Sequence, residues 1–295
     1  MKRFRIGLTK KKDLTGLLYI SPFLVGFLVF FLIPMVQAVV FSFSELKIVP
    51  TGYTTTFVGL ENYRKILFVD PDFVPIFVDT IINTIVNIPA ILIFSFFIAM
   101  VLNQEFFGRS FVRMVFFLPV ILSAGVIIKM EMNDIMNQAM VQEASFMLGG
   151  EQFLNLLLQL RLPPGFIRYI VAVVNRIPLV IEASAIPILI FLAGLQSVPV
   201  DLYEAADVEG ITAWEKFWMI TFPLVSPMIL TNTIYIIIDS FTSYRNEMVV
   251  FIGENAWSRG GYGVSVSMSM LYFLAIAVIL GIIVAILSKR VIYIK

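Results

Sequence analysis

The side chains that could do chemistry are few in this sequence, because its 295 residues include no histidine and no cysteine. This composition excludes disulfides, thiolate nucleophiles, imidazole metal ligands and serine–histidine triads. The sequence also lacks the G-x-x-x-x-G-K-[ST] motif with which a chain cradles nucleotide phosphates. The polar residues that remain favour binding of a solute over covalent catalysis.

One group of polar residues recurs at helical spacing within an apolar stretch. Asn232, Tyr235 and Asp239 are separated by three and four residues, so they lie on one face of the predicted helix. Ionisable groups inside membrane segments usually serve function or pair internally, and this face is therefore a candidate path for a solute. Further candidates in the segments that follow are Tyr244, Asn246, Ser267 and Tyr272. For the serine, a hydrogen bond that packs one helix against another is the alternative explanation.

The elements that must position these residues are membrane helices. Hydrophobic residues make up 59% of the chain and charged residues 14%, whereas soluble domains contain roughly 45–50% apolar and about 25% charged residues. The net charge of +1 leaves no basic footprint for nucleic acid. The composition is that of an integral membrane protein.

Long windows without charged residues predict where the chain crosses the bilayer, since a membrane helix needs about 20 apolar residues. The third window is short, and Arg113 and Lys129 at its ends could snorkel to lengthen it. The fourth window is extended back to about residue 177, so that it includes Glu182. We therefore predict an all-α, polytopic membrane protein in which residues 14–295 form one domain with six transmembrane helices. The six windows are 14–44, 80–104, 114–128, 183–200, 217–238 and 260–288.

The distribution of Lys and Arg predicts the orientation. The basic segment 1–13 is expected in the cytosol, and six crossings return Lys289, Arg290 and Lys295 to the same side. A basic start followed by apolar residues also resembles a signal peptide. However, the apolar stretch is about twice the 7–15 residues of a signal sequence, which favours an uncleaved first span.

Three segments fall on the outer side in this orientation: the short segment 70–72, the long segment 131–176 and the loop 243–262. The segment 131–176 is too long for a turn, and its leucine-rich part, 152–160, could lie on the membrane surface or pack under a bound partner. We favour packing. Near the outer rim, Arg176 and Glu182 could pair with each other.

The loop between spans four and five, about residues 199–218, is predicted to be a cytosolic helix pair. Pro199 suits the first turn of a helix, and Gly210 suits a left-handed stop at its end. Thr212 and Glu215 then fit a capping box that opens a second helix, with Trp214 on its apolar side. Such a pair could dock on another protein, or it could be an interfacial hairpin with solvated charges.

The order of residues in this loop resembles a known signature. Glu204-Ala205-Ala206, Gly210 after three further residues, Ile220 after nine more, and then Phe222-Pro223 resemble the "EAA" loop, E-A-A-x-x-x-G, nine residues, I-x-L-P, of permease subunits in bacterial ABC importers. Phe222 in place of leucine is an apolar exchange. Stretches such as "YISPFLVGFLVFFLIPMVQAVVFSFS" and "FVGLENYRKIL" resemble the carbohydrate-uptake branch, and the likeness extends over nearly the whole chain.

This resemblance implies a multi-pass permease domain in the cytoplasmic membrane of a bacterium. It implies partners: a second homologous permease in a heterodimer, two ATPase subunits, and an extracellular solute-binding protein. ATP and magnesium would then be bound on the ATPase, with no cofactor on this chain. Within the loop, the family role would give Glu204 the charged contact with the ATPase, Ala205 and Ala206 the close approach, and Gly210 the turn. The coupling candidates are Glu204, Ala205, Ala206, Glu209, Gly210 and Trp214.

The cargo implied by the resemblance is a sugar or oligosaccharide, although the site for it could lie on the partner permease. One alternative is an ABC permease for another solute, such as an amino acid or phosphate. A second alternative is an ion-coupled secondary carrier in which Asp239 and Glu182 carry protons, but this leaves the E-A-A loop without a role. An intramembrane enzyme lacks a paired catalytic constellation.

Overall fold

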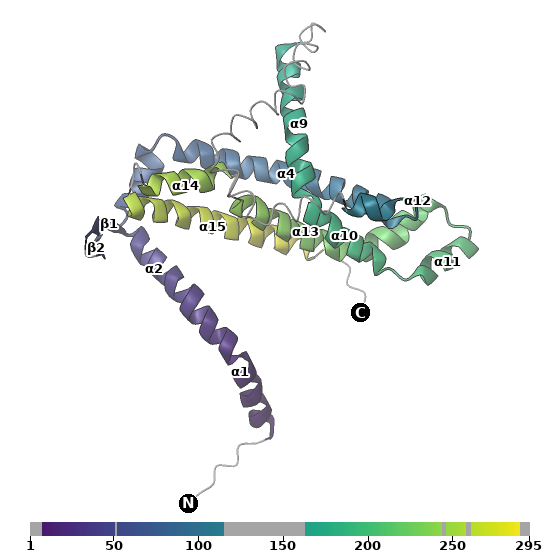
Figure 1. The fold of residues 1–295 in the computed structure, drawn as a ribbon, viewed down its shortest axis with the longest axis horizontal. Coiled ribbons are helices and arrows are strands. Elements are labelled where there is room, and N and C mark those ends of the chain that lie inside the picture. The colour runs from purple at the N-terminus through teal and green to yellow at the C-terminus, as the bar shows by residue number, and fades with distance from the viewer. Residues whose placement is uncertain (1–7, 51, 115–162, 244–245, 258–260, 290–295) are drawn as a thin grey trace, which may run out of the picture. The chain divides into compact units, whose positions relative to one another are not determined.

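The computed structural model describes residues 8–50, 52–114, 163–243, 246–257 and 261–289, mostly as helices (Figure 1). The chain divides into two compact units. The first comprises Met1–Ile81 with Thr242–Val278, and the second comprises Ile82–Phe241 with Ile279–Lys295.

The first unit begins with a continuous helical segment. It runs through α1 (Leu8–Phe27), the π-helical turn η1 (Leu28–Leu32) and α2 (Ile33–Ser42). Its apolar part, Leu18–Ser42, has the length and hydropathy of a membrane span, and none of its most apolar window is buried in the structure. This agrees with the predicted first span, whose side chains would face lipid or partner proteins.

A β-hairpin follows the first span and corrects the expectation of an all-α protein. β1 (Ser44–Val49) pairs antiparallel with β2 (Gly52–Phe57). Residues 45–48 alternate polar and apolar side chains, and β2 contains Tyr53, Phe57 and three threonines, which fit a pleated strand better than a helix. The hairpin was missed because hydropathy windows test only for spans.

A buried polar cluster ties the base of the hairpin to the last helix of the first unit. The hairpin is followed by α3 (Glu61–Arg64), the π-helical turn η2 (Lys65–Val69) and α4 (Phe73–Asn103). The cluster is centred on Asn62 of α3. Asn62 Nδ2 donates to the backbone oxygens of Ser42 and Ser44 at 3.1 and 3.0 Å. Ser267 in α15 (Gly261–Leu287) also donates to the Ser42 carbonyl, at 2.7 Å.

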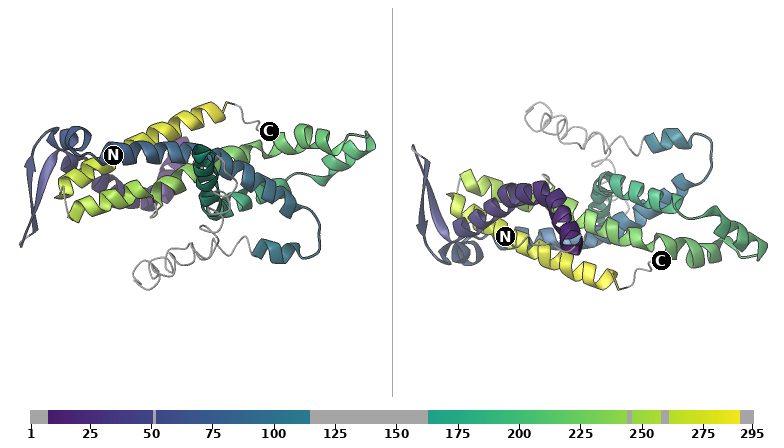
Figure 2. Two further views of the ribbon diagram at one scale, coloured as in Figure 1. Left: turned by 90° about the horizontal axis from the view of Figure 1, so that it is seen from above. Right: turned by 90° about the horizontal axis from the view of Figure 1, so that it is seen from below.

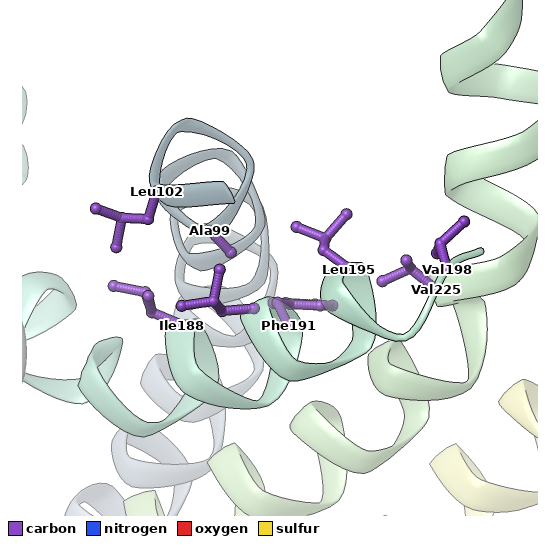
Figure 3. Packing of buried hydrophobic residues seen from close by; sticks show 8 residues of the cluster. Ala99, Leu102, Ile188, Phe191, Leu195, Val198 and Val225 are labelled. Atoms are coloured by element: carbon purple, nitrogen blue, oxygen red, sulfur yellow. The ribbon is translucent and has the colours of Figure 1, made fainter. Parts of the chain in front are cut away.

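The core of the second unit lies where α4, α10 (Ala185–Gln196) and α13 (Phe222–Thr242) meet. Figure 3 shows Ala99 and Leu102 of α4 above Ile188 and Phe191 of α10. The Phe191 ring packs edge-on against that of Phe96, with 5.2 Å between the centroids. The cluster of buried residues comprises Ala99, Leu102, Ile188, Phe191, Leu192, Leu195, Val198 and Val225.

The remaining helices of the second unit differ in part from the predicted elements. α9 (Pro164–Ala183) is helical well before residue 177, so the last part of the predicted outer segment 131–176 is helix and leads into α10. Figure 1 shows a sharp bend where α9 meets α10. The loop contains α11 (Val200–Val208) and α12 (Ala213–Lys216), and the π-helical turn η3 (Phe217–Thr221) joins α12 to α13.

Four helices within the described residues are long and apolar enough to cross a membrane, or five if the bent pair α10 and α11 forms one span. They correspond to the predicted spans one, two, five and six, with the bent pair at span four. Apart from Met114, the predicted span 114–128 lies outside the described residues. The predicted outer loop 243–262 is wrong as a loop, since α14 (Glu247–Trp257) occupies most of it. Its apolar positions recur at helical spacing, but its length is too short for a span window.

Candidate functional site

The loop between α10 and α13 folds locally as its residues predict. Pro199 adopts extended backbone angles at the N-cap of α11, and Asp201 lies in the first turn. A negative charge there is favourable because the amides at a helix N-terminus are unpaired. The axis bends by 60° between α10 and α11, so α11 leaves the direction of the preceding helix.

Gly210 ends α11 with a complete Schellman motif. Its φ of 73° is left-handed, and the amide of Gly210 donates to Asp207 O at 3.1 Å while that of Ile211 donates to Ala206 O at 3.0 Å. This pair of bonds satisfies carbonyls at the end of the helix, and glycine is the residue that adopts the required angles without strain. The predicted turn is confirmed.

The predicted capping box is also present. Thr212 Oγ1 accepts from the amide of Glu215 at 3.4 Å, and Glu215 Oε2 accepts from the amide of Thr212 at 2.9 Å. The Thr212 side chain and backbone hydrogen bonds lower the pKa of the Glu215 carboxyl, which lies in the loop ahead of α13. The carboxylate form therefore holds the start of α12 in place.

Two further contacts hold α11, α12 and η3 together. Lys216 forms an ion pair with Asp207, and the hydroxyls of Tyr203 and Thr221 lie 2.9 Å apart. The first contact joins α12 to α11, and the second joins α11 to the end of η3. Movement of α11 is thereby linked to the helix that continues into α13.

The coupling candidates differ in exposure. Glu204, Ala205 and Glu209 are exposed, and the side chain of Trp214 is 69% exposed beside Trp218. Ala206 is buried within the loop. A partner could reach the first four directly, whereas the small size of Ala206 serves packing of this chain.

The polar face of α13 divides between packing and accessible positions. Asn232 is fully buried; its Nδ2 donates to the carbonyl of Pro187 in α10 at 3.3 Å, and its Oδ1 is buried with no hydrogen-bond partner. One and two turns further on, Tyr235 donates to Asp239 Oδ1 at 3.3 Å, and Asp239 lies within electrostatic reach of Glu182. The predicted shared face exists, but only its part toward the C-terminal end of α13 is accessible, where Tyr235 is half-buried and Asp239 is exposed.

The described candidates in the first unit are mostly buried. Ser267 is fully buried and donates to the carbonyls of Ser42 and Gly263, which favours the packing explanation. Tyr272 is buried and forms a side-chain hydrogen bond with Asn246. Tyr244 lies outside the described residues.

Several interacting residues were not found from the sequence. Arg176 donates to Asn83 Oδ1 at 2.9 Å. The sequence had suggested Glu182 as its partner, and Asn83 was not predicted. Arg113 donates to the carbonyl of Leu102 at 2.7 Å and so caps the end of α4, where a cation is favourable. These contacts join residues far apart in the chain, and spacing alone gives no signal for them. Within the described ranges, no group of three or more His, Cys, Asp or Glu residues could hold a metal ion.

The fold is similar to that of a membrane chain of an ABC importer. A bacterial ABC transporter that imports the acidic polysaccharide alginate has a chain of similar structure, with a TM-score of 0.61 and 17% identity over 95% of this chain and 96% of that one. No family model matches the sequence.

Comparison with curated proteins defines the family. The multiple sugar-binding transport system permease MsmF of Streptococcus mutans is 30% identical over 268 residues, which cover 88% of each chain. The arabinooligosaccharides transport system permease AraP of Halalkalibacterium halodurans is 29% identical over 84% of this chain and 73% of its own. The trehalose/maltose permease MalF of Thermococcus litoralis is 27% identical over 95% and 92%. The chain belongs to the permease subunits of ABC sugar transport systems.

Proposed function

We propose that this permease forms half of the membrane pathway of an ABC importer for a sugar or oligosaccharide, and that the loop 199–218 couples it to a separate ATPase. As a member of this family, the chain is a membrane subunit and not an enzyme. The observation that carries the coupling role is the closed, exposed helix pair with the E-A-A order of residues.

The contacts of the loop support a mechanism in which it acts as a stiff lever on the membrane helices. The Schellman turn, the capping box and the ion pair of Lys216 with Asp207 stiffen α11 and α12 against each other. η3 then continues without a break into α13. When two ATPase subunits close on ATP and magnesium, a docked α11 moves with them and rocks the membrane helices. Glu204, exposed on α11, makes the charged contact, and Ala205 permits close approach.

The complete assembly in this proposal contains six spans in this chain, a second homologous permease, two ATPase subunits and an outer binding protein. Both termini face the cytosol, and the membrane is the cytoplasmic membrane of a bacterium. Support for the binding protein comes from a similar chain, at TM-score 0.61 and 16% identity, in an alginate transporter solved with its pentasaccharide-bound periplasmic protein.

The cargo is proposed from the family and from the polar groups of α13. MsmF and AraP are named for transport of sugars and arabinooligosaccharides. Sugars are uncharged and rich in hydroxyl groups, which aromatic faces and carboxylate oxygens bind well. Tyr235 and Asp239 offer such groups side by side.

Charge reversal at Glu204 tests the coupling role. We expect Glu204→Lys to leave the chain in the membrane and to abolish ATP-driven sugar uptake in reconstituted vesicles, because a cation replaces the anion that faces the ATPase. The matched control is Glu105→Lys, which also reverses an exposed carboxylate. Glu105 forms an ion pair with Arg109 at 3.8 Å on the surface. Because such exposed pairs contribute little to stability, this variant should retain uptake. Unchanged uptake in Glu204→Lys would refute the role of this residue.

A further inference from the structure

The β-hairpin has two chemically different faces. Side chains of directly opposed residues in an antiparallel pair point to the same side, and the register pairs Ile48 with Tyr53 and Ser44 with Phe57. Leu46 and its partner Thr55 lie on the same side, so that Leu46, Ile48, Tyr53 and Phe57 make this face mostly apolar. The other face is mostly polar and contains Glu45, Lys47, Thr54 and Thr56 with Val49 near the turn; on it Lys47 Nζ and Glu45 Oε1 lie 3.4 Å apart.

The apolar face is turned toward the end of the first span. Ser44, on this face, donates from Oγ to the carbonyl of Val40 at 2.9 Å. Tyr53, also on this face, packs edge-on against Phe41 in the last turn of α2, with ring centroids 5.7 Å apart. The apolar face therefore continues the exposed apolar surface of the span, and the polar face points away from it.

The apolar side chains are nevertheless uncovered. Ile48 is 65% exposed, Tyr53 61% and Phe57 79%. A two-stranded hairpin is only marginally stable in water by itself, so a face of this kind gains from an apolar environment. Its contact with the span makes the adjoining lipid the nearest such environment.

The base of the hairpin is fixed. The amide of Val58 donates to Phe43 O at 2.9 Å, and Asn62 holds the carbonyl of Ser44 at 3.0 Å. Figure 2 shows the strands running across the end of α14 and α15 and not along these helices. A strand pair held across the ends of membrane helices lies along the membrane surface.

We propose that the hairpin Ser44–Phe57 is an interfacial anchor, with Leu46, Ile48, Tyr53 and Phe57 in the boundary between headgroups and acyl chains at the C-terminal end of the first span. Aromatic and aliphatic side chains are enriched in this layer. In the proposed orientation this is the outer leaflet. The inference depends on the first span crossing a bilayer and is independent of the coupling loop.

The absence of cysteine from the natural chain allows a direct test. Single replacements on the apolar face, Ile48→Cys and Phe57→Cys, are compared with Lys47→Cys and Thr54→Cys on the polar face. Lys47 and Ile48 are neighbours in one strand, so only the face differs. The complete transporter, in nanodiscs of phosphatidylcholine and phosphatidylglycerol, is labelled with the polarity-sensitive fluorophore NBD. Quenching is measured with aqueous iodide and with lipids that carry a nitroxide near the headgroup.

We expect labels at 48 and 57 to emit at shorter wavelength, to be quenched by the nitroxide lipid, and to have iodide quenching constants several-fold smaller than those at 47 and 54. Equal iodide quenching at all four positions would overturn the proposal. It would also be overturned if 48 and 57 became protected only after addition of the sugar-loaded binding protein, because the face would then bind protein. Neither outcome depends on whether Glu204 contacts the ATPase.

Discussion

At the scale of single residues, Asn62 organises the end of the first span. Its amide donates to two backbone carbonyls, those of Ser42 and Ser44. Tyr63, next in the chain, donates from its hydroxyl to Ser42 Oγ at 2.8 Å. These carbonyls lie where a helix ends and a strand begins, so they have no regular partners of their own, and unpaired buried carbonyls are costly.

Gly263 allows α15 to approach this cluster. A Cβ at this position would lie 2.3 Å from the backbone oxygen of Ser44 and 3.3 Å from Asn62 Nδ2. We expect Gly263→Ala to destabilise the protein by about 1–3 kcal/mol, since overpacking against backbone cannot be relieved by a side-chain rotation. Thermal unfolding in detergent measures the change.

The control is Gly281→Ala in the same helix, where a Cβ would meet nothing within 4 Å. This substitution should be neutral or stabilise by up to about 1 kcal/mol, because alanine is the better helix former. Equal unfolding temperatures for the two variants would contradict the role of the close approach at Gly263.

Residue-level prediction from sequence succeeded where the interaction is local. Gly210 and the pair Thr212 and Glu215 act within a few positions, so their spacing contains the whole signal. Ser267 was assigned to a pathway because a polar residue in an apolar helix gives no sign of its partner. That partner is a carbonyl 225 positions away.

At the scale of elements, three π-helical turns each end two positions before a proline. η2 ends at Val69 ahead of Pro71, where the helix stops. η1 ends at Leu32 ahead of Pro34, and η3 ends at Thr221 ahead of Pro223, and there the helix continues. In each, the amide that follows bonds to the first carbonyl of the wide turn. A proline lacks an amide proton and its ring crowds the preceding turn, so the wider turn lets the helix continue. Pro22, Pro89 and Pro227 lie inside α-helices.

The contact of α10 with α13 depends on a glycine and a methionine. A Cβ on Gly194 would lie 2.5 Å from Met228 Cγ. We expect Gly194→Ala to cost about 1–3 kcal/mol by overpacking, and Met228→Ala to cost less than the roughly 2–5 kcal/mol of a fully buried methionine, because Met228 is only partly buried. In the double variant the two changes offset, so the loss should be smaller than the sum of the single losses. Unfolding measurements on the four proteins test this; strict additivity would argue against direct contact.

Element prediction was reliable for spans and poor between them. Long apolar windows are explained by the membrane alone, and four of the six correspond to long apolar helices, with a bent pair at a fifth. The hairpin and α14 are short, half-exposed elements whose stability comes from tertiary contacts. Their sequences are compatible with loops, so hydropathy did not distinguish them.

At the scale of the whole molecule, the chain is one subunit of a larger transporter. It belongs to a family of permeases and has no nucleotide-binding motif. In the proposed function, energy enters through contact with a separate ATPase subunit. The exposed helix pair of α11 and α12, linked to α13 by Tyr203 and Thr221, is the part best built to receive it.

The most direct test is a site-specific photo-crosslink from the loop. A benzophenone amino acid replaces Glu209, which is exposed at the end of α11 and does not need the small size of Ala205. The same group at Thr54 in the hairpin serves as control. We predict that irradiation of membranes containing the complete transporter joins position 209, and not position 54, to the ATPase subunit. If position 209 gives no adduct with the ATPase while the transporter still takes up sugar, the loop is not the site of coupling.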